Sequence, residues 1–193
     1  MKRAVFLDRD GVINHEVGYI KELSNLKLID NSAKAIKKLN KSEFLTIVVT
    51  NQSGPARGYY PESWVIKLHE RLKELLKKEG AYIDYIYYCP HLPEGIVKEY
   101  SFVCDCRKPR IGMLKKAAIE HNIDLFDSYM IGDKATDIET GKNAGCITIL
   151  VKTGYGEQIL KGEYQYIPNP NFIAKDLLEA VDWILNNERV RNS

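Results

Sequence analysis

Five short apolar runs rich in β-type residues, separated by segments with helical spacing, constrain this chain more than any other feature. We expect strands over residues 4–7, 44–49, 83–88, 128–131 and 146–151. We expect helices over residues 32–40, 61–79 and 112–121, a fourth after Asp133, and a packing helix that contains Leu177, Val181, Ile184 and Leu185. Such alternation is typical of stacked βαβ units. The sequence therefore predicts an α/β fold with a mainly parallel sheet.

The length and charge of the chain limit what it can be. With 193 residues it can form one domain, residues 1–193, with a sizeable core. Its net charge of +2 lacks the basic excess typical of nucleic-acid-binding proteins. No apolar stretch approaches the roughly 20 residues that span a membrane, and the first residues do not resemble a signal peptide. We therefore expect a cytoplasmic monomer that binds neither nucleic acid nor membrane.

The first apolar run, Ala4 to Leu7, ends in two carboxylates one residue apart, Asp8 and Asp10, followed by Gly11. In an open α/β sheet, ligands bind at the carboxyl ends of the strands. Two close carboxylates repel one another unless a cation or a shared proton compensates. The pair therefore indicates a metal site, proton-transfer chemistry, or both.

Three further segments place reactive groups at expected strand ends or helix starts. They are Thr50-Asn51-Gln52-Ser53-Gly54, Arg107-Lys108-Pro109, and Gly132-Asp133-Lys134-Ala135-Thr136-Asp137. Mg²⁺ is held by carboxylates, waters and substrate phosphate oxygens, so a convergence of these segments would form a magnesium and phosphate site. Its members would be Asp8, Asp10, Asp133, Thr50 and Lys108. In such a site Asp8 can form an aspartyl-phosphate, while Asp10 protonates the leaving alcohol and later activates water.

Each of these features has an ordinary explanation when it is taken alone. An Asp-x-Asp at a strand end is more often a loop acid, and Thr50 alone is a turn residue. Arg107 and Lys108 could be a solvated pair, and Asp133 and Asp137 could only cap a helix. Their ordered occurrence at four expected strand ends favours a functional site.

Taken together, these motifs resemble those of the haloacid dehalogenase-like phosphatases over about residues 3–151. The matching residues are Asp8-Arg9-Asp10-Gly11, Thr50, Lys108, and Gly132-Asp133 through Asp137. The resemblance implies a Rossmann-like three-layer sandwich and a Mg²⁺-dependent phosphomonoesterase with Asp8 as nucleophile and Asp10 as acid/base. Asp8, Asp133 and the main-chain carbonyl of Asp10 would hold the Mg²⁺. Val12 stands where the family usually has threonine, which removes a hydroxyl but no expected catalytic group.

Two intervals are too short for a separate domain over the site. Residues 12–32 leave room for a flap only, and the long helix and one strand use most of residues 51–107. We therefore expect a capless member of the fold. We assign no role to residues 155–171, which are rich in Gly, Tyr and Pro.

Three of the four cysteines cluster within 18 residues, together with one histidine. In a reducing compartment such a cluster indicates metal rather than disulfides. Three thiolates and one imidazole fill a tetrahedral shell, so Cys89, His91, Cys104 and Cys106 predict a structural Zn²⁺ site in a loop over residues 89–106. The spacing is not that of a zinc finger, and the alternative is a set of small buried thiols beside an exposed histidine. Cys146 lies in an apolar run and is expected in the core.

The Cys/His cluster indicates which group within this phosphatase family the chain resembles. Cys-x-His with Cys-x-Cys-Arg-Lys-Pro is similar to the group that contains the D-glycero-D-manno-heptose 1,7-bisphosphate 7-phosphatases and the histidinol-phosphatases. The twelve-residue gap and Ser53 look more like the heptose enzymes. The resemblance implies substrate contacts by Arg9, Glu16, Gly18, Tyr19, Asn51, Gln52, Ser53, Gly54, Arg107, Lys108 and Lys134. Ile111 stands where the family commonly has proline.

The leading hypothesis is therefore removal of the 7-phosphate from a small phosphorylated sugar, the heptose bisphosphate. Alternatives are a histidinol-phosphatase or another small phosphoester phosphatase, a nucleic-acid 3′-phosphatase, and a non-enzymatic phosphoacceptor module. The acid/base Asp10 and the cationic segment at Arg107 argue against the phosphoacceptor module. The lack of a basic excess argues against a nucleic-acid substrate.

Overall fold

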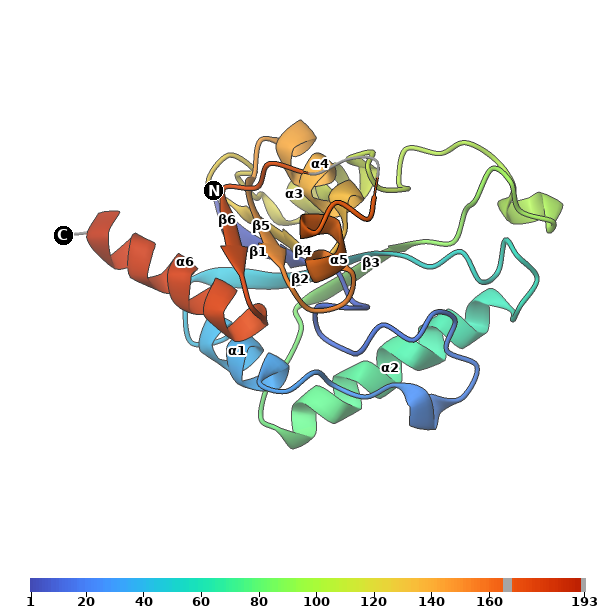
Figure 1. Ribbon diagram of the computed structural model, residues 1–193, viewed down its shortest axis with the longest axis horizontal. Helices are drawn as coiled ribbons and strands as arrows, with labels where there is room; N and C mark the ends of the chain where they lie inside the picture. Colours follow the sequence, from blue (N-terminus) through green and yellow to red (C-terminus); the bar gives the residue numbers. More distant parts are fainter. Residues whose placement is uncertain (165–167, 192–193) are drawn as a thin grey trace.

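A six-stranded parallel sheet forms the centre of the computed structural model, which describes residues 1–164 and 168–191 (Figure 1). The strand order is β3-β2-β1-β4-β5-β6, and every neighbouring pair is parallel. The strands are β1 (Arg3–Leu7), β2 (Phe44–Asn51), β3 (Tyr85–Cys89), β4 (Tyr129–Gly132), β5 (Ile147–Val151) and β6 (Phe172–Ala174). The five expected strands are confirmed, each boundary lying within two residues of the expected one.

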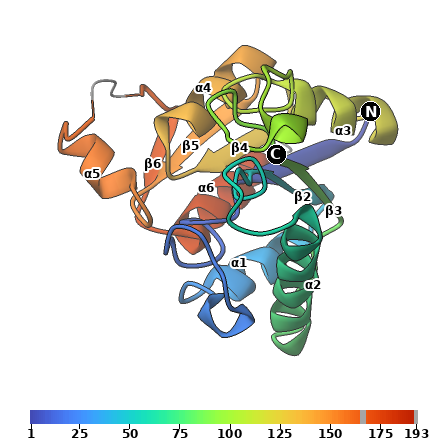
Figure 2. The same ribbon diagram turned by 90° about the vertical axis from the view of Figure 1, so that its right-hand side faces the viewer.

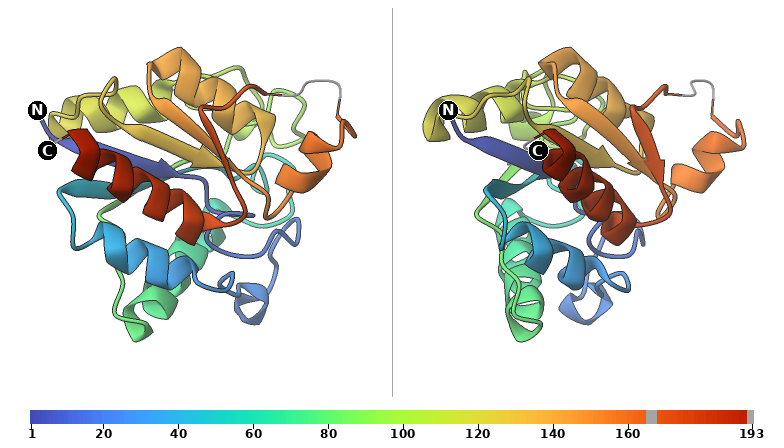
Figure 3. Two further views of the ribbon diagram at one scale, coloured as in Figure 1. Left: turned by 60° about the vertical axis from the view of Figure 1, so that its left-hand side comes forward. Right: turned by 90° about the vertical axis from the view of Figure 1, so that its left-hand side faces the viewer.

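Helices cover both faces of this sheet. They are α1 (Ser32–Leu39), α2 (Glu62–Lys78), α3 (Gly112–His121), α4 (Ala135–Ala144), α5 (Gly156–Leu160) and α6 (Leu177–Arg191), with short 3₁₀ turns η1 (Leu23–Asn25) and η2 (Lys98–Tyr100). Helices α1, α2 and α6 lie on one face, and α3 and α4 lie on the other (Figures 1 and 3). The predicted three-layer α/β fold is therefore confirmed.

The central strand β1 shows why its sequence is apolar throughout. Val5 and Leu7 belong to the core cluster formed with α1, α2 and α6, whereas Ala4 and Phe6 belong to the cluster formed with α3. Because side chains alternate between the two faces of a strand, a strand covered on both sides needs an unbroken apolar run. The same burial fixes the register that places Asp8 at the end of the strand.

Helix α2 carries the expected apolar stripe, and Leu68, Leu72 and Leu76 are fully buried. The expected start at Pro61 is one residue early, because Pro61 has an extended backbone (φ −69°, ψ 158°) and the helix begins at Glu62. The indole Nε1 of Trp64 donates a hydrogen bond to the carbonyl of Ile20 at 2.8 Å. This contact anchors the flap, residues 12–31, to the helix.

Two elements lie outside the sequence predictions, α5 and β6. They have five and three residues, too few for the hydrophobic period on which such predictions depend. The side chain of Asn171 holds this region to β5, since its Oδ1 accepts hydrogen bonds from the Thr148 backbone and hydroxyl. Residues 165–167 of the stretch to which we assigned no role lie outside the described residues.

All six strands point their carboxyl ends toward one side of the molecule, which faces the viewer in Figure 2. The flap, the segment between β2 and α2, and the 89–106 loop gather on this side. Helix α2 and strand β3 occupy most of the interval between residues 52 and 89, as expected of a fold without a cap domain. Within the described ranges, no helix is long and apolar enough to cross a bilayer.

Candidate active site

Lys108 lies at the centre of the site, between one carboxylate at a strand end and another in a helix. Its Nζ is 2.9 Å from Oδ1 of Asp8, which follows β1, and 2.6 Å from Oδ1 of Asp137 in the first turn of α4. It also donates to the carbonyl of Val49 at 2.8 Å. Burial would lower the pKa of this ammonium, but Asp137 and Asp8 outweigh that effect and raise it. Lys108 is therefore a permanently charged group buried beside Asp8.

Asp137 has a larger part in the site than the sequence motif indicated. It is fully buried, and its Oδ2 accepts the Lys134 backbone N–H at 3.0 Å, which caps the helix as expected of an acid in the first turn. Its other oxygen pairs with Lys108. Gly132 permits this approach, because a Cβ there would lie 2.1 Å from the Cβ of Asp137. The only sequence signal for the role is the spacing of four residues from Asp133.

Asp133 lies in a narrow cradle of backbone. A Cβ at Gly11 or at Gly154 would lie 2.1 Å from its Oδ2, so only glycine fits at either position. Oδ2 accepts the Tyr155 N–H at 3.0 Å, whereas the buried Oδ1 has no hydrogen-bond partner in the part of the chain that the structure describes. Burial raises the pKa of Asp133 well above its usual value, and the nearby carboxylates of Asp8 and Asp137 add to the increase.

The donor set fits a hard divalent cation. Carboxylate oxygens of Asp8, Asp133 and Asp137 lie within 4.8 Å of one another and are buried. The neighbouring Lys134 ammonium is offset by its ion pair with Glu16. Three ionised carboxylates against Lys108 then leave an excess of two negative charges, the charge of one divalent cation. Oxygen ligands of this kind are those that Mg²⁺ prefers. The unpartnered Oδ1 of Asp133 is a ligand atom that nothing else in the site satisfies.

The carboxylate of Asp10 faces a different set of partners from that of Asp8. Arg9 donates to it through Nε and Nη2 at 2.8–3.2 Å, Asn14 donates at 2.8 Å, and Gln52 donates at 2.8 Å. Burial would raise the pKa of Asp10, but the Arg9 charge and these hydrogen bonds outweigh burial and lower it. The sequence did not point to Asn14, whose only signal is its position four residues after Asp10.

Several expected substrate contacts have partners within the protein. Arg9 is only 1% exposed and faces Asp10. Asn51 grips the main chain of Lys108, because its Nδ2 donates to the Lys108 carbonyl at 3.1 Å and its Oδ1 accepts the Lys108 N–H at 3.0 Å. The Gln52 amide joins the Thr50 hydroxyl at 2.9 Å to the Asp10 carboxylate. These side chains therefore hold Asp10, Lys108 and Thr50 in position.

The flap closes one side of the site. Glu16 accepts the Gly18 N–H at 2.8 Å and forms an ion pair with Lys134 at 2.8 Å. The hydroxyl of Tyr19 lies 3.3 Å from that of Ser53. The flap therefore contacts Ser53, which follows β2, and Lys134, the N-cap residue of α4.

The Cys/His cluster assembles as expected at the base of the 89–106 loop. The sulfurs of Cys89, Cys104 and Cys106 are 3.0–3.5 Å apart, and Nδ1 of His91 is 3.3 Å from the Cys106 sulfur. The four cysteines of the chain are free thiols. Tetrahedral Zn–S bonds of about 2.3 Å place sulfurs roughly 3.8 Å apart, so a small expansion accommodates the ion. Arg107 donates to the His91 carbonyl at 3.1 Å, which joins the cluster to the cationic segment. Cys146 is buried in the core, as expected.

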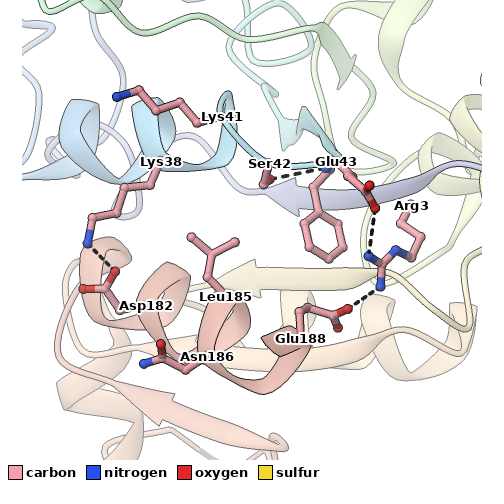
Figure 4. A pocket seen from close by; sticks show the side chains of 10 residues that line it. Arg3, Lys38, Lys41, Ser42, Glu43, Asp182, Leu185, Asn186 and Glu188 are labelled. Atoms are coloured by element: carbon pink, nitrogen blue, oxygen red, sulfur yellow. Dashed lines mark hydrogen bonds and ion pairs between the residues drawn. The ribbon is translucent and has the colours of Figure 1, made fainter. Parts of the chain in front are cut away.

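A second charged region lies at the other end of the sheet (Figure 4). It is a hollow of about 840 Å³ between α1 and α6, lined by Arg3, Lys38, Lys41, Ser42, Glu43, Phe44, Asp182, Leu185, Asn186 and Glu188. Two of its three cations pair with its own acids, Arg3 with Glu188 and Glu43, and Lys38 with Asp182. Because it faces the amino ends of the strands, it lies away from the groups described above.

Comparisons with known proteins identify the family of the chain. Residues 105–180 match a family model described as HAD-hydrolase-like. The chain is 51% identical over 185 residues to a D-glycero-D-manno-heptose-1,7-bisphosphate 7-phosphatase of Thermosynechococcus vestitus, covering 94% of each chain. It is 42% identical over 185 residues to the D-glycero-beta-D-manno-heptose-1,7-bisphosphate 7-phosphatase of Escherichia coli K12, covering 95% of this chain and 88% of the relative.

A solved structure is similar over nearly the whole fold. It is the D,D-heptose 1,7-bisphosphate phosphatase from B. bronchiseptica in complex with magnesium and phosphate, with a TM-score of 0.85 and 30% identity. The match covers 97% of this chain and 99% of that one. The protein therefore belongs to the haloacid dehalogenase-like hydrolases, in the branch that contains the heptose-1,7-bisphosphate 7-phosphatases.

Proposed function

We propose that this protein is a Mg²⁺-dependent phosphomonoesterase that removes the 7-phosphate of D-glycero-D-manno-heptose 1,7-bisphosphate. One observation carries the proposal: the Asp8 carboxylate lies 2.9 Å from the buried Lys108 ammonium at the edge of an acidic cluster suited to a divalent cation. The names of the relatives support the choice of substrate. We further propose that residues 1–193 act as one domain, as a monomer in the cytoplasm.

In the first step, a carboxylate oxygen of Asp8 attacks phosphorus and the bond between phosphorus and the ester oxygen breaks. The product is an aspartyl-phosphate, and the alcohol leaves with a proton from Asp10. A water then attacks the same phosphorus, gives its proton to Asp10 and releases orthophosphate, which restores Asp8. The fixed ammonium of Lys108 offsets negative charge on the transferring group without reorganising.

Mg²⁺ would be held by Asp8, Asp133 and the main-chain carbonyl of Asp10, and when bound it would offset the charge of the phosphate beside these carboxylates. Asp137 holds Lys108 and the start of α4 in place for this arrangement. Thr50 would hydrogen-bond a phosphate oxygen. Its hydroxyl is already oriented by Gln52.

Asp10 must carry a proton when the alcohol leaves, although its pKa is lowered while it faces Arg9. A phosphate bound next to it would raise that pKa, because a like charge favours the neutral form. Its partners Asn14 and Gln52 hold the carboxylate in place through the cycle. Asp10 thus gains its proton when a substrate arrives.

We propose that Zn²⁺ is bound by Cys89, His91, Cys104 and Cys106, and that it shapes the 89–106 loop. This loop presents Arg107 beside a hollow of about 310 Å³ that Lys108 and Arg110 also line. Arg107 would bind the sugar or the phosphate that is not cleaved. The remaining substrate contacts would come from Arg9, Glu16, Gly18, Tyr19, Asn51, Gln52, Ser53, Gly54 and Lys134.

Asp8→Asn tests the central claim. Phosphate release should fall below detection while the circular dichroism spectrum and the zinc content stay those of the wild type, because the amide is isosteric but not nucleophilic. Retained turnover would contradict the assignment of Asp8 as nucleophile.

The substrate is tested by comparing kcat/KM for both anomers of the heptose bisphosphate, fructose 1,6-bisphosphate, histidinol phosphate and a 3′-phosphorylated oligonucleotide. We expect the heptose bisphosphate to be preferred by at least about 100-fold, as a site with paired polar contacts allows. Equal and slow turnover of all of them would exclude the heptose assignment while leaving the phosphatase chemistry in place.

A further inference from the structure

One carboxylate outside the catalytic groups joins the 89–106 loop to the rest of the site. Glu62, in the first turn of α2, accepts hydrogen bonds from two tyrosine hydroxyls, Tyr88 to Oε1 at 2.9 Å and Tyr100 to Oε2 at 3.0 Å. Tyr88 is the neighbour of the cluster residue Cys89, and Tyr100 ends the short η2 turn inside the loop. Both oxygens of one side chain are thus used to hold two parts of the same metal-binding unit.

The charge of Glu62 is suited to this contact. No cation lies within ion-pair distance of it among the residues that the structure describes. The two phenols and its position at the helix N-terminus stabilise the carboxylate instead. Each phenol hydroxyl donates to a different oxygen of the carboxylate, so neither acceptor atom is shared.

The loop has a second attachment, to the segment between β2 and α2. The backbone N–H groups of Ile96 and Val97 donate to the carbonyl of the buried Ala56 at 2.8 and 3.1 Å. Gly95 lies so close that a Cβ there would be 2.7 Å from the same carbonyl oxygen. This segment begins with Gln52, whose amide holds Asp10 and Thr50. The metal-binding loop and the acid/base are therefore attached to one short piece of chain that ends in Glu62.

We propose that Glu62 is a positioning residue that couples the two regions, so that Zn²⁺ in the 89–106 loop and phosphate in the catalytic site each strengthen the binding of the other. The reason is linkage: each ligand orders its own segment, and Glu62 with Ala56 makes the two segments one unit. The coupling rests on the proposed zinc site.

The test is the rate at which the zinc-loaded protein releases Zn²⁺ to an excess of a chromophoric chelator, with and without Mg²⁺ and orthophosphate. In the wild type, orthophosphate should slow release. In Glu62→Ala the rate without phosphate should rise roughly five- to tenfold, as expected from the loss of hydrogen bonds to a charged group. The effect of orthophosphate should disappear. Glu70→Ala, an exposed glutamate on the same helix, is the matched control and should behave as the wild type.

Tyr100→Phe removes only one hydroxyl and keeps the proposal testable if Glu62→Ala folds poorly. It should raise the release rate about threefold by itself and should add nothing in a Glu62→Met background, which keeps the length of the side chain but has no acceptor oxygen. Turnover gives a third measurement: KM for the sugar bisphosphate should rise while kcat stays within about twofold.

Additive effects of Glu62→Met and Tyr100→Phe, or zinc release from Glu62→Ala at the wild-type rate, would overturn this inference and leave the proposed function in place. A wild-type protein that purifies folded and without zinc would overturn the proposed zinc site, and this inference with it. In Asp8→Asn, loss of turnover with unchanged zinc release would support the proposed chemistry and would leave the role of Glu62 unaffected. Retained turnover would contradict the chemistry alone.

Discussion

Charged side chains gather at both ends of the sheet, but they differ in how far they are exposed to solvent. At the carboxyl end, the side chains of Lys108, Asp8 and Asp137 are at most 5% exposed. At the amino end, the side chains of Lys38 and Asp182 are 39% and 43% exposed. Solvent screens the second pair and not the first group.

The charge count also differs between the two regions. The hollow of Figure 4 has three cations, Arg3, Lys38 and Lys41, and three acids, Glu43, Asp182 and Glu188. The acidic cluster has three carboxylates against Lys108, because the neighbouring Lys134 is itself paired with Glu16. A region whose charges balance needs no further ion, whereas a buried excess of negative charge is unfavourable until a cation offsets it. The comparison therefore identifies the region built for a ligand without using pocket size, which would favour the other end.

Lys108→Met should have the largest effect, because it removes the only cation between two buried carboxylates. We expect kcat to fall by about 10³, which is typical for loss of a fixed group that stabilises transition-state charge. The metal-free protein should lose about 3–5 kcal/mol of unfolding free energy, as buried ion pairs do when one partner is removed. Steady-state kinetics and urea denaturation measure the two effects. An activity loss of less than tenfold would mean that Lys108 is not part of the chemistry.

Asp133→Asn should change the free energy of unfolding less than Lys108→Met does, and it should raise it rather than lower it. The folded protein raises the pKa of Asp133 above its unfolded value. The protonated Asp133 therefore contributes fully to the free energy of unfolding below the unfolded pKa. This contribution is lost as pH rises through the folded pKa. At pH 7, above the unfolded pKa, the metal-free wild type is destabilised by this shift, and the amide, which does not titrate, removes that cost. We expect the metal-free variant to be more stable by about 2 kcal/mol, in the range found when functional strain is relieved.

The measurement is thermal unfolding with chelator at pH 7 and at pH 4. The gain in Tm should shrink at pH 4, where Asp133 approaches its neutral form in the wild type as well. Adding Mg²⁺ should raise the Tm of the wild type and not of the variant, and the variant should be inactive. A lower Tm for metal-free Asp133→Asn at pH 7 would contradict the proposed electrostatic cost.

Most of the fold follows from the sequence, because long strands and helices repeat their apolar period many times. The stripe of Leu68, Leu72 and Leu76 is of this kind, and so is the run from Ala4 to Leu7. The parts that sequence reasoning missed are too short to show a period, namely α5 and β6. The start of α2 differs by one residue because Pro61 is compatible with both the extended and the helical backbone.

Within the site, sequence reasoning identified reactive groups better than their partners. Asp8, Asp133 and Lys108 come together as expected, since each follows or precedes an element with a clear pattern. The fixed positions of Asn51 and Asn14 depend on contacts between distant segments, which no local pattern records. Arg9, an expected substrate contact, donates to the Asp10 carboxylate, and the sequence did not indicate this partner. Asp137 had a local explanation as a helix cap, and this explanation hid its ion pair with Lys108.

The smallest effect is expected at the amino end, from Lys38→Met, the same substitution as Lys108→Met in an exposed pair. Exposed ion pairs contribute about 0–1 kcal/mol because solvent and salt screen them. A double-mutant cycle of Lys38→Met with Asp182→Asn, followed by urea denaturation, should give a coupling energy below about 1 kcal/mol that vanishes in 1 M salt. Both kcat and KM should equal those of the wild type. A coupling above roughly 2 kcal/mol, or a change in turnover, would show that charge at the amino end is not screened as its exposure implies, and the contrast between the two ends would fail.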